Sequence, residues 1–135
     1  MSHKDKQNDF KLFYDQLKHV SFETSNAIDK LLPVDGSVSD KLVDAMRYTS
    51  IGSGKCFRPF LLFSSAKIFS IPLPKVINIC AAIEMVHCYS LIHDDLPAMD
   101  DDNVRRGKPA CHIAYDEATA ILSGDALLTY AFNII

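Results

Sequence analysis

The chain has 135 residues, 48% of them hydrophobic, which is enough for one globular domain with its own core. Its 14 Lys and Arg residues against 17 Asp and Glu residues give a net charge of -3, which excludes the broad basic surface of a nucleic-acid-binding protein. Any anionic ligand must therefore be bound by a small local cluster of cations.

The first predicted element is an amphipathic helix. Residues 1–9 are polar and charged, and we expect them to form a disordered tail. From Phe10 to Leu32 apolar residues recur mostly at steps of three or four, which is the helical spacing. Pro33 and Gly36 should end this helix.

A second, shorter helix follows. Ser37 or Ser39 is a suitable N-cap, and one face then carries three apolar residues, Leu42, Val43 and Met46. The glycine-containing stretch Ser50 to Gly54 should be a loop.

The middle of the chain predicts two more helices, the second unusually long. Pro59 fits the first turn of the third helix, which must end before Pro72 and Pro74. From Pro74 the pattern continues without a breaker to Asp95, about 22 residues or roughly 33 Å at 1.5 Å per residue.

The last third predicts a charged loop and a final helix. Asp100 to Lys108 should be the loop, and helical periodicity then runs from Ala114 to Ile135 without a cap. No strand-like alternation persists, so we expect an all-α, antiparallel helical bundle.

Cysteine spacing and hydropathy indicate where the protein acts. The four cysteines lack the C-x-x-C spacing of zinc sites, and the polar N-terminus lacks the apolar core of a signal peptide. No apolar run reaches the roughly 20 residues needed to span a bilayer. We therefore expect reduced thiols in a soluble, cytoplasmic protein with no membrane span.

An acidic cluster stands at the end of the long helix. Asp94 and Asp95 are followed by three more aspartates at 100–102, although a helix C-terminus already disfavours negative charge. A hard cation such as Mg²⁺, which prefers carboxylates, waters and phosphate oxygens, would compensate, and Arg105 and Arg106 could then bind the phosphate. A solvated acidic loop with surface salt bridges is the alternative.

A second basic segment, GSGKCFRPF, lies upstream. Lys55 and Arg58 flank the predicted start of the third helix, where backbone amides favour anions. A P-loop is excluded, because Thr49 and Cys56 occupy positions where that motif needs Gly and Ser or Thr. His87 lies seven residues before Asp94 on the same helix face, although a buried core histidine would show the same spacing.

Together these segments resemble the trans-isoprenyl (polyprenyl) diphosphate synthase family, particularly its bacterial farnesyl diphosphate synthases. The resemblance rests on DDLPAMD at Asp94–Asp100, matching DDxxxxD, followed by Arg105, Arg106 and Gly107. It extends to GKxxRP at 54–59, HxYSLIHDD at 87–95 and GDALLT at 124–129. It implies a helical bundle of the isoprenoid synthase type.

The resemblance also implies roles for individual residues. Asp94 and Asp100, helped by Asp95, would bind Mg²⁺ that bridges an allylic diphosphate (dimethylallyl or geranyl), which Arg105 would contact. A second pocket, for isopentenyl diphosphate, would consist of Gly54, Lys55, Arg58, His87 and Arg106. The family usually has a basic residue where this chain has Cys56, which would weaken that pocket slightly.

The product is implied by Tyr89, five residues before Asp94. In the family a bulky residue there, with the two-residue motif insertion, favours a C15 product, farnesyl diphosphate; the simpler interpretation is that Tyr89 belongs to the core. The resemblance further implies a homodimer.

The family's second Asp-rich motif and its later lysine do not occur in these 135 residues. Residues 10–135 therefore correspond to the N-terminal part of a polyprenyl synthase domain, and we expect little or no synthase activity from them alone.

Two other hypotheses remain. A truncated or split chain, inactive unless it pairs with a partner, fits the missing motif. A metal-dependent phosphohydrolase of the His-Asp type would use His87 and the pair His93 and Asp94, but it leaves the RRG and GKxxRP segments unexplained.

Overall fold

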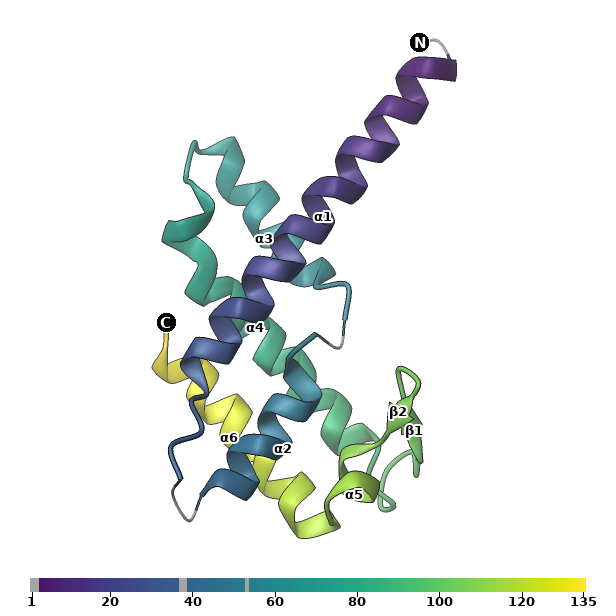
Figure 1. Ribbon diagram of the computed structural model, residues 1–135, viewed down its shortest axis with the longest axis vertical. Helices are drawn as coiled ribbons and strands as arrows, with labels where there is room; N and C mark the ends of the chain where they lie inside the picture. The colour runs from purple at the N-terminus through teal and green to yellow at the C-terminus, as the bar shows by residue number, and fades with distance from the viewer. Residues whose placement is uncertain (1–2, 37–38, 53) are drawn as a thin grey trace.

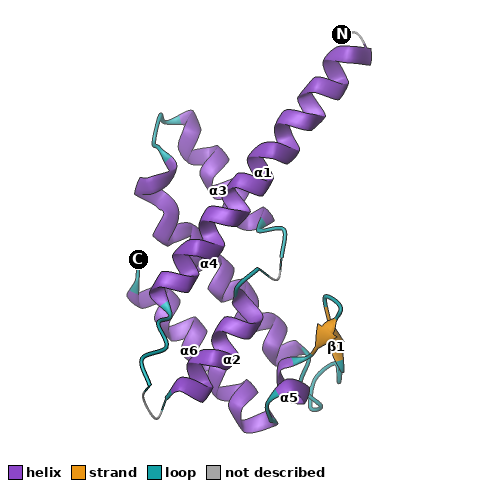
Figure 2. Cartoon of the chain, viewed as in Figure 1, coloured by secondary structure: helices purple, strands orange, loops and turns teal. Residues whose placement is uncertain are grey.

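A computed structural model describes residues 3–36, 39–52 and 54–135, and most of them belong to helices (Figure 2). The helices are α1 (His3–Leu31), α2 (Asp40–Ser50), α3 (Phe57–Ile68), α4 (Leu73–Asp94), α5 (Cys111–Ala114) and α6 (Glu117–Asn133). One two-stranded hairpin, β1 (Val104–Arg105) with β2 (Lys108–Pro109), lies between α4 and α5. The all-α prediction is confirmed.

Helix α1 begins earlier than its apolar pattern predicted. It starts at His3, within the segment we expected to be a disordered tail, and ends at Leu31, close to the predicted end. Residues 7–15 are all exposed, and this half of α1 projects from the bundle (Figure 1). Ser39 occupies the N-cap position of α2 but makes no side-chain cap hydrogen bond; the alternative cap, Ser37, is outside the described residues.

Helix α4 is the central helix of the bundle (Figure 1). It contacts α1, α2, α3 and α6 and has nine buried residues. At 22 residues it is long and apolar enough to cross a membrane, although we predicted no such span. In this fold part of its apolar surface, including Met85 and Ile92, belongs to the core of the bundle.

The main core lies where α4 packs against α6, α2 and the second half of α1. Its fully buried large side chains include Ile28, Met85, Ile92 and Leu127. Each aliphatic side chain of this size contributes about 1.5–3 kcal/mol by leaving water. This packing fixes the end of α4, and with it Asp94 and Asp95, relative to the rest of the bundle.

The last helical segment is interrupted, contrary to the prediction of one continuous helix from Ala114. The short helix α5 ends at Ala114, and Asp116 caps α6. Its Oδ1 accepts from the Thr119 backbone amide at 2.7 Å, and its Oδ2 accepts from the Thr119 hydroxyl at 2.8 Å. Lys41 Nζ donates to Asp116 Oδ2 at 2.6 Å. This hydrogen bond, together with the two cap hydrogen bonds from Thr119, lowers the pKa of Asp116 to about 2. An Asp followed three residues later by Thr thus marks a second helix start.

Candidate functional site

The charged segment after α4 folds back as a tight hairpin rather than an irregular loop. β1 pairs antiparallel with β2, with Arg105 opposite Lys108. The two turn residues, Arg106 and Gly107, have φ values of 54° and 77°. Two consecutive positive φ angles are typical of the type I′ turns that connect two-residue hairpins, and glycine adopts them without strain. The hairpin therefore holds Arg105 in a strand and Arg106 in the turn, so that the two side chains point in different directions.

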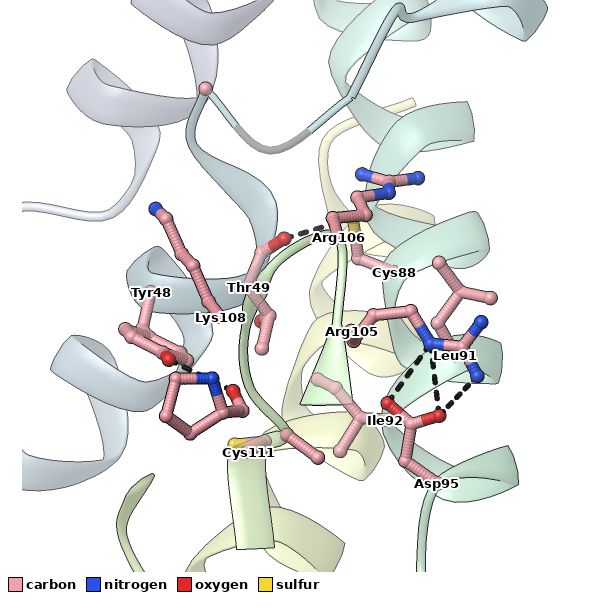
Figure 3. Close-up of a pocket in the computed structure, with 13 residues that line it drawn as sticks. Tyr48, Thr49, Cys88, Leu91, Ile92, Asp95, Arg105, Arg106, Lys108 and Cys111 are labelled. Atoms are coloured by element: carbon pink, nitrogen blue, oxygen red, sulfur yellow. Dashed lines mark hydrogen bonds and ion pairs between the residues drawn. The ribbon is translucent and has the colours of Figure 1, made fainter. Parts of the chain in front are cut away.

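Arg105 points toward the end of α4 and binds Asp95 (Figure 3). Its Nε donates to both carboxylate oxygens, at 3.0 and 3.2 Å, and its Nη2 also contacts Oδ1. The same Nη2 donates to Asp102 Oδ2 at 3.0 Å. The Asp95 side chain is only 3% exposed, and its hydrogen bonds are the main reason that the pKa of Arg105 is raised. Asp95, which we had grouped with the metal-binding carboxylates, is thus engaged by an arginine.

Arg106 points the other way, toward α4 and the segment before α3. Its Nη2 lies 3.2 Å from His87 Nε2, and its guanidinium lies so close to Gly54 that a Cβ there would be 2.5 Å from Nη1. Gly54, Lys55 and Arg106, together with Gly52, line an open hollow. The sequence-predicted cluster of Gly54, Lys55 and Arg106 is therefore brought together.

Arg58 and His87 complete this basic cluster. Arg58 lies in the first turn of α3. Burial lowers the pKa of His87, and the positive charges of Arg58, Arg106 and Arg105 lower it further. His87 therefore remains a neutral imidazole to lower pH than an exposed histidine, which suits a hydrogen-bonding partner rather than a permanent cation.

Asp94 and Asp100 lie at the two ends of the turn that follows α4. The Asp100 amide donates to the Asp94 carbonyl at 2.8 Å; Asp94 is partly exposed and Asp100 is exposed. Across residues 3–36, 39–52 and 54–135, no three His, Cys, Asp or Glu side chains converge as a metal cluster. Two accessible carboxylates nevertheless suit Mg²⁺, which is usually bound by one or two carboxylates, with waters and phosphate oxygens completing its shell.

Tyr89 and His93 belong to the contact between α4 and α6. Their rings meet edge to face at 5.5 Å, and His93 Nε2 lies 3.1 Å from the Ile121 carbonyl and 3.8 Å from Asp125. A Cβ at Gly124 would collide with the His93 ring, so this glycine allows the two helices to approach. We had considered His93 only as part of a His-Asp phosphohydrolase; a glycine inside a helical pattern was the available signal for this packing contact. The His-Asp phosphohydrolase hypothesis loses support, because His93 turns toward α6 whereas His87 turns toward Arg106.

Behind the hairpin lies a small cavity of about 110 Å³ (Figure 3). Tyr48, Cys88, Leu91 and Cys111 are among the residues that line it. The Tyr48 hydroxyl donates to the Pro109 carbonyl at 2.8 Å, which fastens the hairpin to α2. All four cysteines are free and buried, as expected for reduced thiols, and burial raises the pKa of Cys88 to about 12.

Residues 39–135 match the family model described as Polyprenyl synthetase. The chain is 45% identical over 123 residues to a farnesyl diphosphate synthase of Haemophilus influenzae, covering 91% of this chain and 42% of that protein. It is 42% identical over 123 residues to a farnesyl diphosphate synthase of Escherichia coli, covering 91% of this chain and 41% of that one.

Solved structures show the same similarity. An FPP/GFPP synthase from Zymomonas mobilis superposes with a TM-score of 0.85 at 44% identity, covering 87% of this chain and 42% of that structure. A geranyltranstransferase from Thermotoga maritima superposes with a TM-score of 0.80 at 34% identity, covering 88% of this chain and 44% of that structure. The chain thus has an isoprenoid synthase fold and spans about two fifths of the length of these relatives.

Proposed function

Because this chain belongs to the polyprenyl synthetase family, we propose that it carries the first half of the two-diphosphate site of a Mg²⁺-dependent prenyltransferase. The reaction joins an allylic diphosphate, dimethylallyl or geranyl, to isopentenyl diphosphate. The observation that carries this proposal is the pair of neighbouring arginines, of which Arg105 faces the acidic end of α4 and Arg106 faces His87 and Gly54. One hairpin thereby supplies a cation to each of two adjacent anion sites.

Arg105 would serve the allylic diphosphate. Ionisation of that substrate leaves a carbocation and a multiply charged leaving group, so donors fixed in advance at the departing oxygens lower the barrier. Arg105 is held in advance by Asp95, and it also contacts Asp102 at the exposed side.

Asp94 and Asp100 would hold Mg²⁺, which when bound neutralises diphosphate oxygens. Asp95 is better suited to orient Arg105 than to bind metal, because its carboxylate is buried against that guanidinium. We therefore propose two metal-binding aspartates, Asp94 and Asp100, where the sequence had indicated Asp95 as a third.

The second anion site, formed by Gly54, Lys55, Arg58, His87 and Arg106, would bind isopentenyl diphosphate. The hollow at Gly54 and Lys55 is open to solvent, which suits a ligand that must enter and leave. A neutral His87 would donate or accept one hydrogen bond beside the guanidinium of Arg106. Cys56, where the family usually has a basic residue, is buried and adds no positive charge.

The carbon chain of the allylic substrate needs an apolar, water-free wall, because water would quench the carbocation. Tyr89, on α4 five residues before Asp94, supports a short C15 product, farnesyl diphosphate. We also propose that the protein is a homodimer in the cytoplasm. The 135 residues alone should turn over little substrate.

The second site is tested by titrating the chain with isopentenyl diphosphate without metal. Replacing Arg106 by alanine should weaken binding about 10- to 100-fold, the range for loss of a charge-assisted hydrogen bond. Lys108→Ala is the matched control, since Lys108 lies on the same hairpin with its Nζ over the Tyr48 ring, 5.7 Å from its centroid. Equal losses in the two variants would reduce Arg106 to a general surface charge and refute the assignment.

A further inference from the structure

The hairpin of β1 and β2 is attached to α2 through Tyr48. The Tyr48 hydroxyl donates to the backbone carbonyl of Pro109 in β2 at 2.8 Å. The Tyr48 ring has a contact of its own on two sides: the Tyr115 ring meets it edge to face at 5.6 Å, and Lys108 Nζ lies 5.7 Å from its centroid. Tyr48 therefore holds the backbone of the hairpin with a ring that is itself held in place.

A cavity lies under the hairpin, so individual contacts with the bundle matter for the hairpin's position. On the hairpin side this cavity of about 110 Å³ is lined by Arg105, Arg106, Lys108 and Pro109, and Tyr48 lines it from α2. Atoms that face a void lose the contacts that neighbouring atoms would supply. The position of the hairpin therefore depends on point attachments, of which the Tyr48 hydrogen bond is one.

The Tyr48 attachment uses neither arginine. In Figure 3, Tyr48 lies on one side of the hairpin and Asp95 on the other. Asp95 holds the hairpin through the guanidinium of Arg105, and His87 lies against that of Arg106. Both guanidinium groups must share their N–H donors with a phosphate when it binds, whereas a hydroxyl bond to a backbone carbonyl can stay unchanged.

We propose that Tyr48 is a positioning residue: its hydroxyl holds the hairpin backbone, and with it both arginines, in place before either diphosphate arrives. This inference rests on the proposed function of the two anion sites. A binding group that is already held in its bound position loses less freedom on binding, so preorganisation raises affinity. Because one hairpin carries Arg105 and Arg106, loss of the Tyr48 hydroxyl should weaken both sites.

Tyr48→Phe isolates this hydroxyl, because phenylalanine keeps the ring and its contacts. We expect the variant to bind isopentenyl diphosphate, and separately pyrophosphate with Mg²⁺, each about fivefold more weakly, the factor for one neutral hydrogen bond. Calorimetric titration measures both affinities. Unchanged affinities for the two ligands would overturn the proposal.

Tyr130→Phe is the matched control. The Tyr130 hydroxyl also donates to a backbone carbonyl, that of Leu31 at 3.0 Å, but this bond joins α6 to the end of α1. A general loosening of the fold should affect both variants, whereas positioning predicts that Tyr130→Phe binds both ligands like the unmodified chain. Circular dichroism and thermal unfolding verify that each variant is folded. Equal losses of affinity in Tyr48→Phe and Tyr130→Phe would contradict positioning.

Combining Tyr48→Phe with Arg106→Ala tests whether Tyr48 acts through the arginine. Without the Arg106 side chain, Tyr48→Phe should cause no further loss of isopentenyl diphosphate binding, since the two residues then act as one unit. Binding of pyrophosphate with Mg²⁺ should still weaken about fivefold, through Arg105. An additive loss of isopentenyl diphosphate binding would show that Tyr48 acts independently of Arg106, against the proposal.

Hydrogen exchange supplies a readout that needs no ligand. The Ala110 amide donates to the Asn103 carbonyl at 2.9 Å and closes the base of the hairpin. This amide should exchange about fivefold faster in Tyr48→Phe and at an unchanged rate in Tyr130→Phe. Failure of the unmodified chain to bind isopentenyl diphosphate would refute the proposed function alone; unchanged exchange of the Ala110 amide in Tyr48→Phe would refute the role of Tyr48.

Discussion

Replacing Asp94 and Asp100 together by asparagine should abolish the Mg²⁺-dependent part of inorganic pyrophosphate binding to the chain. These two carboxylates are the accessible oxygen ligands at the end of α4, whereas Asp95 is buried against Arg105. Loss of even an outer-shell partner lowers metal affinity about 10- to 100-fold, so removal of both direct ligands should cost about 100-fold or more. Calorimetric titration with pyrophosphate, with and without Mg²⁺, measures the effect.

The control for this double variant is Asp101→Asn. Asp101 is exposed, lies next to Asp100 and has a φ of 53°, a conformation that asparagine tolerates well. It removes one negative charge from the same cluster and should leave the Mg²⁺ dependence intact. If the double variant binds pyrophosphate with an undiminished response to Mg²⁺, the assignment of Asp94 and Asp100 is wrong.

Asp95→Asn should destabilise the fold more than any other single change in the acidic cluster. It leaves the Arg105 guanidinium at the helix end without its buried anionic partner, so that only the exposed Asp102 remains. Breaking a fully buried pair costs about 3–5 kcal/mol; because Arg105 is 35% exposed, we expect the free energy of unfolding to fall by about 2–3 kcal/mol. Urea unfolding monitored by circular dichroism measures this difference.

Asp102→Asn removes the other carboxylate that contacts Arg105, at the exposed side of the same guanidinium. We expect a loss of no more than about 1 kcal/mol, as for surface ion pairs. Similar losses for Asp95→Asn and Asp102→Asn would contradict a distinct structural role for Asp95.

The elements of the fold followed from local patterns in the sequence. The long α4 was predicted almost to the residue, because proline marks its start and no breaker interrupts it before Asp94. Another proline, Pro33, marked the end of α1, which stops two residues earlier at Leu31. The break at Asp116 was missed, since apolar periodicity continues across it and only the Asp-to-Thr spacing indicates a cap.

The partners of the site residues were harder to predict. Motif spacing grouped Asp95 with Asp94, but which of the two turns toward Arg105 depends on where the hairpin returns. The tight turn at Arg106 and Gly107, with its two positive φ angles, sets where the hairpin returns, and no apolar pattern in the sequence marks it.

The most direct test of the central claim is whether the chain binds two diphosphates at once. Isopentenyl diphosphate should be titrated calorimetrically into the chain, first alone and then in the presence of Mg²⁺ and saturating pyrophosphate. Two adjacent sites, one at Arg105 with Asp94 and Asp100 and one at Arg106 with His87, predict one equivalent of isopentenyl diphosphate in both titrations. Complete competition by pyrophosphate would show a single anion site and contradict the account.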